Sequence, residues 1–173
     1  SSFNPKHDAV KFNDNINREI ENNKKVLFVK HHIEHYEGKF PLWVICELFT
    51  FGMLSYFYND LTTADKKEFA GAQYKEMVSW LRCCTDLRNI CAHYGRLCFR
   101  IFTAMPSGFS ISDAEKRRLW GTVLSVKSLY PSNEKWNNEF LPNLEALFEE
   151  YKDDIELYHL AFPADWADKL VKV

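Results

Sequence analysis

The chain has 173 residues, of which 46% are hydrophobic and 16% are aromatic, and its formal net charge at pH 7 is −2. This length and composition suit one domain with a packed core and exclude a disordered or fibrous protein. The near-neutral charge also excludes a general basic surface, so any nucleic-acid binding must come from a local cluster of cations.

Two apolar patterns fill the first third of the chain. Residues 14–36 place apolar side chains at helical spacing among charged ones and predict an amphipathic helix. Gly38 ends that pattern, and Pro41 suits the first turn of another helix. The segment PLWVICELFTFGMLSYFYNDL is apolar on nearly every side, which predicts a buried central helix. Charged and small residues interrupt it too often for a membrane span.

The rest of the chain is also predicted to be helical. Thr62 stands three residues before Asp65, and Ser112 three before Glu115, a spacing typical of capping boxes. Further helices are predicted over residues 73–101, from 112 to about 130, and from Pro142 to about 159. The sequence therefore predicts an all-α bundle of about five to six helices in a single domain over residues 1–173.

Two stripes run along the helix predicted over residues 73–101, because residues three and four apart share a helix face. The apolar stripe consists of Met77, Trp80, Cys84, Leu87, Cys91, Tyr94, Cys98 and Ile101. The polar stripe consists of Arg82, Asp86, Asn89, His93, Arg96 and Arg100. The cysteines are interpreted as small core residues, since their spacing fits neither a zinc site nor a disulfide framework. Reduced cysteines predict a cytoplasmic protein.

The polar stripe concentrates arginine around one histidine and one asparagine. The planar arginine side chain suits phosphate, and histidine both takes and gives a proton near neutral pH. The stripe is either a site for an anionic substrate or a solvated or interface surface. Arg88 and His93 are five residues apart, roughly 140° around a helix. For both to act on one substrate, either the long Arg88 side chain reaches across or the groups of a partner molecule meet it, as in a site built by a dimer.

Three separated segments resemble one family. The string LRNICAHYGRLCFR, the upstream string FVKHHIEHYEGKFPLWVICELFTFGMLSYFYNDL and the closing LAFPADW are similar to motifs of the Abi-like proteins of bacterial abortive infection, of the AbiD/AbiF type. LRNICAH also fits the R-x₄-H signature of the HEPN superfamily of helical ribonucleases. The resemblance spans residues 3–166, with Ala161 where glycine is usual and Cys98-Phe99 where Trp-Asn is commoner. It implies that a helical N-terminal region of the full-length protein precedes this HEPN-like domain.

The resemblance implies RNA cleavage that needs no metal and no other cofactor, at a site formed between two copies of the chain. The ribose 2′-OH attacks the adjacent phosphate and leaves a 2′,3′-cyclic phosphate and a 5′-OH. His93 is then the general acid or base, Arg88 holds the scissile phosphate, and Asn89 positions His93 or the phosphate. The expected partners are RNA and a second copy of the chain, with no membrane.

Further residues have weaker assignments. Arg96 and Arg100 are expected to contact the RNA backbone, and the resemblance places His32 at the site. Glu47 lies within an apolar segment, so it either forms a structural ion pair or orients Arg88 or His93.

Several alternatives stay open. His31 and His35 share a helix face that zinc could use, but surface or packing histidines are the favoured interpretation and no metal site is expected. Lys116, Arg117 and Arg118 are interpreted as a solvated helix start, with guidance of RNA as the alternative. The chain could also be a non-catalytic RNA-binding or regulatory module. A third hypothesis is a HEPN toxin controlled by an antitoxin protein of the nucleotidyltransferase type.

Overall fold

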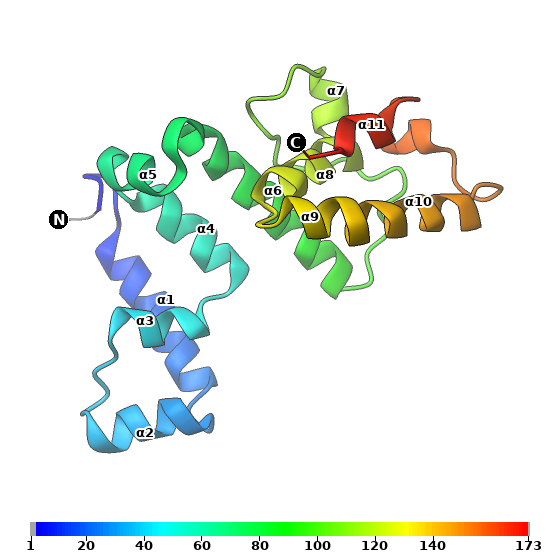
Figure 1. Ribbon diagram of the computed structural model, residues 1–173. Helices are drawn as coiled ribbons and strands as arrows, with labels where there is room; N and C mark the ends of the chain where they lie inside the picture. Colours follow the sequence, from blue (N-terminus) through cyan, green and yellow to red (C-terminus); the bar gives the residue numbers. More distant parts are fainter. Residues whose placement is uncertain (1–2, 173) are drawn as a thin grey trace. The chain divides into compact units, whose positions relative to one another are not determined.

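The computed structural model describes residues 3–172 and divides into two compact units (Figure 1). Unit 1 ends at Phe69 and unit 2 begins at Ala70. All regular structure in the described residues is helical, apart from an isolated β-bridge between Phe3 and Leu61. The all-α class predicted from the sequence is therefore confirmed. The single domain over residues 1–173 and the HEPN-like arrangement stay predictions.

Short helices make up both units. Unit 1 contains α1 (Ala9–Asn22), α2 (Leu27–His35), α3 (Leu42–Ile45), the 3₁₀ turn η1 (Cys46–Leu48), α4 (Phe51–Asp60) and α5 (Thr63–Ala70). Unit 2 contains η2 (Gly71–Gln73), α6 (Tyr74–Ala92), α7 (Asp113–Lys116), α8 (Leu119–Leu129), α9 (Asn133–Lys135), the π-helical turn η3 (Trp136–Phe140), α10 (Leu141–Glu150), η4 (Leu157–Leu160) and α11 (Trp166–Leu170).

Aromatic side chains hold unit 1 together around α1 and α4. Phe12 packs against Phe49 and Phe57, each with a ring-centroid separation of 6.0 Å. Phe3 lies 5.7 Å from Phe57 and stacks on His7, whose Nδ1 lies 2.9 Å from the Asp60 carboxylate. These ring contacts therefore join the chain's first residues to α4.

The prediction of one buried helix over PLWVICELFTFGMLSYFYNDL is wrong. The segment breaks after η1, where Phe49 and Thr50 adopt extended backbone angles. The Thr50 side chain then accepts the Met53 N–H at 3.2 Å and caps α4. Trp43 is 76% exposed and Glu47 is also exposed, so the carboxylate expected to be buried is not.

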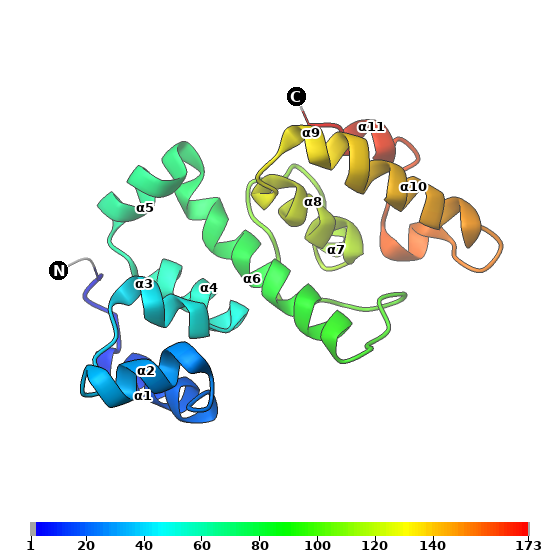
Figure 2. The ribbon, with the colours of Figure 1, turned by 60° about the horizontal axis from the view of Figure 1, so that its bottom comes forward.

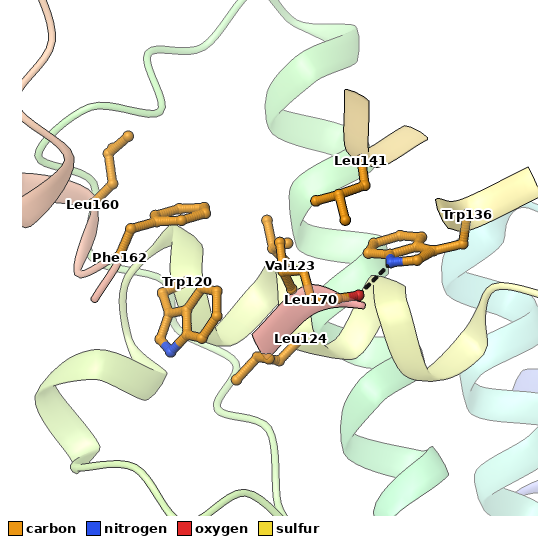
Figure 3. Close-up of a cluster of buried hydrophobic side chains, with 8 residues drawn as sticks. All are labelled: Trp120, Val123, Leu124, Trp136, Leu141, Leu160, Phe162 and Leu170. Carbon is orange, nitrogen blue, oxygen red and sulfur yellow. Dashed lines mark hydrogen bonds between the residues drawn. The ribbon is translucent and has the colours of Figure 1, made fainter. Parts of the chain in front are cut away.

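The core of unit 2 lies between α8, α10 and the C-terminal segment (Figure 3). Its buried members are Trp120, Val123, Leu124, Trp136, Leu141, Leu160, Phe162 and Leu170. Trp136 is fully buried, and its indole N–H donates to the Leu170 carbonyl oxygen at 2.7 Å. This hydrogen bond fixes the last helix, α11, to the turn η3.

Helix α8 packs along α6, and the two run side by side in Figure 2. Trp120 to Ser125 are all buried, so α8 is the most enclosed helix of unit 2. Gly121 sits where α8 meets the end of α7, and a Cβ at residue 121 would lie 2.6 Å from the Lys116 carbonyl oxygen. The absence of a side chain allows this close approach of two backbones.

Gly121→Ala is therefore expected to destabilise the protein, although the same change in an open helix gains about 1 kcal/mol. The clash is with backbone, which cannot rotate away, and overpacking of this kind costs about 1–3 kcal/mol. Urea denaturation followed by circular dichroism measures the change. A stability equal to or above that of the wild type would contradict the packing at residue 121.

Several predicted helix ends are right and others are wrong. Thr62 and Ser112 cap α5 and α7 as predicted, and Ser112 with Glu115 forms a complete capping box. The helices predicted over 14–36 and 112–130 each break in two, and α10 ends at Glu150 instead of near residue 159. These breaks raise the number of helices above the five to six predicted. Within residues 3–172, no helix combines the length and hydropathy that a bilayer span requires.

Candidate functional site

The polar stripe divides where α6 ends. Ala92 is the last helical residue, His93 is the C-cap, and Tyr94 adopts the left-handed conformation with φ +53°. The Gly95 N–H donates to the Ile90 carbonyl oxygen at 2.8 Å, and the Tyr94 N–H to that of Cys91 at 3.1 Å. This pair of hydrogen bonds is a Schellman motif, which reverses the chain. The helix predicted over 73–101 is therefore wrong beyond residue 92.

Tyr94 occupies the position that glycine usually takes in this motif, and its side chain is 100% exposed. The left-handed conformation costs a residue with a Cβ about 1 kcal/mol, and here no burial of the ring offsets that cost. Tyr94→Gly is expected to raise the free energy of unfolding by about 0.5–1 kcal/mol. Chemical denaturation measures this change, and a loss of stability would contradict the conformation assigned to residue 94.

The last turn of α6 carries the three residues with predicted catalytic roles. The Arg88 guanidinium donates from Nη1 to the Asn89 side-chain oxygen at 3.1 Å. The Asn89 backbone carbonyl accepts the His93 N–H, also at 3.1 Å. All three side chains are exposed. Asn89 thus links Arg88 and His93, through its side chain on one side and its backbone on the other.

Arg88 and His93 do not meet within one chain. Among the hydrogen bonds of residues 3–172, none joins their side chains, and neither side chain pairs with a carboxylate. Arg96 is exposed in the irregular stretch after the Schellman motif. It therefore follows the turn at the end of α6 and does not continue a helical stripe from His93.

A cavity of about 360 Å³ lies between α6 and the chain that returns along it. Its lining comes from α6 and from the returning segment, and consists of Arg82, Asp86, Asn89, Ile90, Arg100, Ile101, Phe102 and Thr103. Two of these were predicted site residues, Asn89 and Arg100. Arg82 was placed in the polar stripe but was not assigned to the site. His93 and Arg96 are not part of this lining.

Hydrogen bonds hold the returning segment against α6. Asp86 accepts the Ala104 N–H at 3.2 Å, and the Trp80 indole N–H donates to the Ser107 carbonyl oxygen at 2.9 Å. Arg118 donates to the Phe99 carbonyl oxygen at 2.8 Å and fixes the beginning of the segment. Arg100 of this segment therefore lines the same cavity as Arg82 of α6, whereas one continuous helix would have kept the two far apart along its axis.

The cysteines are divided between the interior and the surface. Burial raises the pKa of the Cys83 thiol to about 11 and that of Cys84 to about 12. Both are therefore protonated thiols at neutral pH and poor nucleophiles. The predicted apolar stripe is right for Trp80, which is buried, and wrong at its other end, where Cys91 is exposed.

The remaining predicted site residues lie in unit 1. His32 has its Nδ1 2.9 Å from the Phe28 carbonyl oxygen and stacks on Phe40, with ring centroids 5.1 Å apart. It lines a cavity of about 710 Å³ together with His31, His35 and Trp43. Glu47 is exposed on η1. The roles of His32 and Glu47 beside the residues of α6 stay predictions.

The histidine pair considered for zinc is close in space. The rings of His31 and His35 have centroids 4.7 Å apart. In the part of the chain that the structure describes, no group of three or more His, Cys, Asp or Glu side chains is arranged to hold a metal ion. A two-residue pair leaves half of the tetrahedral coordination of zinc unfilled.

These features define a class, an all-α protein whose longest helix ends in an exposed Arg-Asn-x₃-His segment beside an arginine-lined cavity. A sequence model of the Abi-like protein family matches residues 1–98 of the 173, so the chain belongs to the Abi-like family. The match includes the segment from Arg88 to His93 and stops before LAFPADW, whose resemblance stays a prediction. Searches of the curated proteins and of the solved structures found no significant match.

Proposed function

We propose that this Abi-like protein acts in abortive infection as a metal-independent endoribonuclease of the HEPN type. The observation that carries the proposal is the end of α6, where Arg88, Asn89 and His93 are exposed and connected through Asn89. A guanidinium that binds phosphate and an imidazole that moves protons are the two groups that cleavage beside a 2′-OH needs. Membership of the Abi-like family supports the link to abortive infection.

The proposed reaction is a transfer of the phosphate within the RNA. A general base removes the proton of the ribose 2′-OH, and the 2′ oxygen forms a bond to the adjacent phosphorus. The bond from phosphorus to the 5′ oxygen breaks, and a general acid gives that oxygen a proton. The products are a 2′,3′-cyclic phosphate and a 5′-OH. Arg88 stabilises the charge that grows on the phosphate oxygens, and Asn89 holds the guanidinium in place.

Two chains are proposed to build each site. The reaction needs one group that accepts a proton and one that donates it, whereas α6 presents a single histidine, His93. The partner's His93 supplies the second group in a two-fold dimer. This arrangement also overcomes the separation of Arg88 from His93 around one helix, because each residue can face the substrate from a different chain.

Two rival functions make different predictions. A non-catalytic RNA-binding module would bind RNA without cleaving it, and the net charge of −2 gives that rival some support. A toxin controlled by a nucleotidyltransferase-type antitoxin would cleave RNA until it was modified near the Arg-Asn-x₃-His segment. Cleavage by the isolated protein therefore separates the first rival from the proposal, and loss of cleavage after modification identifies the second.

The test is to incubate the purified protein with end-labelled RNA in the presence of EDTA, beside the variant His93→Ala. The proposal predicts products with a 2′,3′-cyclic phosphate and a 5′-OH, which the variant does not form. Intact RNA with equal RNA binding by both proteins would overturn it. A cleavage that needs added metal and survives in the variant would also overturn it.

A further inference from the structure

We propose that the cavity between α6 and residues 100–103 binds one backbone phosphate of RNA, next to the scissile one, and that Arg82 is a binding residue of this subsite. The inference rests on the proposed function and extends it to a second phosphate. It adds a residue that the sequence pattern did not assign to the site.

The cavity offers more cationic than anionic groups. Arg82 enters it from α6 and Arg100 from the returning segment, and neither has a carboxylate partner among the ion pairs of residues 3–172. Asp86 also lines the cavity, but one of its oxygens already accepts the Ala104 N–H. Two guanidiniums and one carboxylate leave a net positive charge, which favours an anion.

Neutral groups of the lining also suit a phosphate. The side-chain oxygen of Asn89 is occupied by Arg88 at 3.1 Å, so the amide NH₂ is the end of Asn89 that stays available to a ligand. Thr103 adds a hydroxyl that can donate to a phosphate oxygen. Four of the eight lining residues thus carry a side-chain donor for an oxyanion: Arg82, Asn89, Arg100 and Thr103.

Asn89 also fixes where the cavity lies along the RNA. Its side chain belongs to the lining and is hydrogen-bonded to Arg88, the residue proposed to hold the scissile phosphate. A phosphate in the cavity is therefore separated from the scissile phosphate by little more than one side chain. This places the subsite at a neighbouring nucleotide of the same strand.

Inorganic phosphate and a mononucleotide carry the same chemical group and could also enter the cavity. RNA is favoured as the source because the cavity adjoins Arg88, which a free phosphate would leave without a ligand. The affinity for RNA should depend on the length of the RNA strand, whereas the affinity for free phosphate cannot. The two ligands also differ in how the cavity arginines affect their binding. If free phosphate were the only occupant, inorganic phosphate would bind the wild type and not the double variant, while RNA affinity would not depend on the cavity arginines.

The experiment measures binding of the full chain to a short 2′-O-methyl RNA, which lacks the attacking hydroxyl and is not cleaved. The variants are Arg82→Gln, Arg100→Gln and the double variant. The control is Lys135→Gln, which also removes one positive charge, from the exposed side of α9 and outside the cavity lining. Each titration is repeated over a range of salt concentrations and with inorganic phosphate as competitor.

Each arginine variant is expected to weaken RNA binding by about tenfold, the loss of one charged hydrogen-bonding group. The double variant is expected to bind less weakly than the product of the two losses, because both arginines hold one phosphate. The slope of log K against log salt should fall by about 0.7, the value for one phosphate contact on a single strand. Lys135→Gln should stay within about twofold of the wild type.

The outcomes separate this subsite from the proposed function. Wild-type affinity and salt slope in both arginine variants would overturn the subsite, whether or not RNA is cleaved. Arginine-dependent binding by a protein that never cleaves RNA would leave the subsite standing and overturn the ribonuclease. No binding of RNA by the wild type at low salt would overturn both. Binding of inorganic phosphate alone that is lost in the double variant, with RNA affinity unchanged in both arginine variants, would assign the cavity to free phosphate instead of RNA.

Discussion

His93→Ala is expected to lower the rate of RNA cleavage by about 10²–10⁴-fold, the usual contribution of a general acid or base. If each site uses two copies of the histidine, the loss should lie at the upper end of this range. The side chain of residue 93 is exposed, so its removal should leave the fold intact. Single-turnover cleavage of labelled RNA gives the rate, and RNA affinity should change by less than about threefold.

A variant of a second exposed histidine provides the control for the effect of His93→Ala on the cleavage rate. His35→Ala removes another exposed imidazole, from α2 in unit 1, and should keep the wild-type rate. Equal losses in both variants would indicate a general effect on the protein. An unchanged rate in His93→Ala would remove this histidine from the reaction.

Trp136→Ala is expected to cost about 3–5 kcal/mol of stability, the range for removal of a large buried aromatic side chain. Trp136 is fully buried, stacks on Phe140 with ring centroids 4.2 Å apart and donates to the Leu170 carbonyl oxygen. Its removal leaves a cavity and a buried carbonyl without its donor. Equilibrium urea denaturation measures the loss.

Trp136→Phe keeps most of the ring volume and removes the N–H, so it should lose about 1–3 kcal/mol and stay folded. It therefore provides a measurable value even where the alanine variant does not fold. A loss below about 0.5 kcal/mol for both variants would contradict the place of Trp136 in the core.

Local chemistry explains which helix starts could be predicted from the sequence. The caps at Thr62 and Ser112 depend on residues within three positions, and both were found. The break at Thr50 had the same kind of signal, a threonine that accepts the N–H of Met53, but the apolar residues around it favoured a continuous helix. The hydrophobic pattern therefore hid a cap that was present in the sequence.

The end of α6 could not be read from the sequence in the same way. A Schellman motif usually has glycine in the left-handed position, whereas here Tyr94 takes that position and Gly95 follows it. Gly95 therefore stands one residue after the position at which a glycine usually marks the end of a helix. The cavity depends on this turn, because Arg100 reaches the side of Arg82 only after the chain has reversed.

The proposed site residues at the end of α6 could be named from the sequence because their spacing and the R-x₄-H resemblance both depend on positions close together in the chain. Arg88 and Asn89 are in direct contact, as expected of adjacent exposed residues at a helix end. Arg82 was not assigned to the site because Arg100, which lines the same cavity, comes from a segment that the sequence pattern had assigned to the same helix. Tertiary hydrogen bonds, among them those of Trp80 and Asp86, hold that segment against α6.

The central claim is that two chains together cleave RNA, and mixing of subunits tests it most directly. Wild-type protein is exchanged with increasing amounts of His93→Ala at a fixed wild-type concentration, and the cleavage rate in EDTA is measured. An about ninefold excess of the variant should leave roughly a tenth of the activity, since random exchange in a two-fold dimer gives that fraction of wild-type chains a wild-type partner. A rate that does not change with added variant would contradict a site built from both copies of His93.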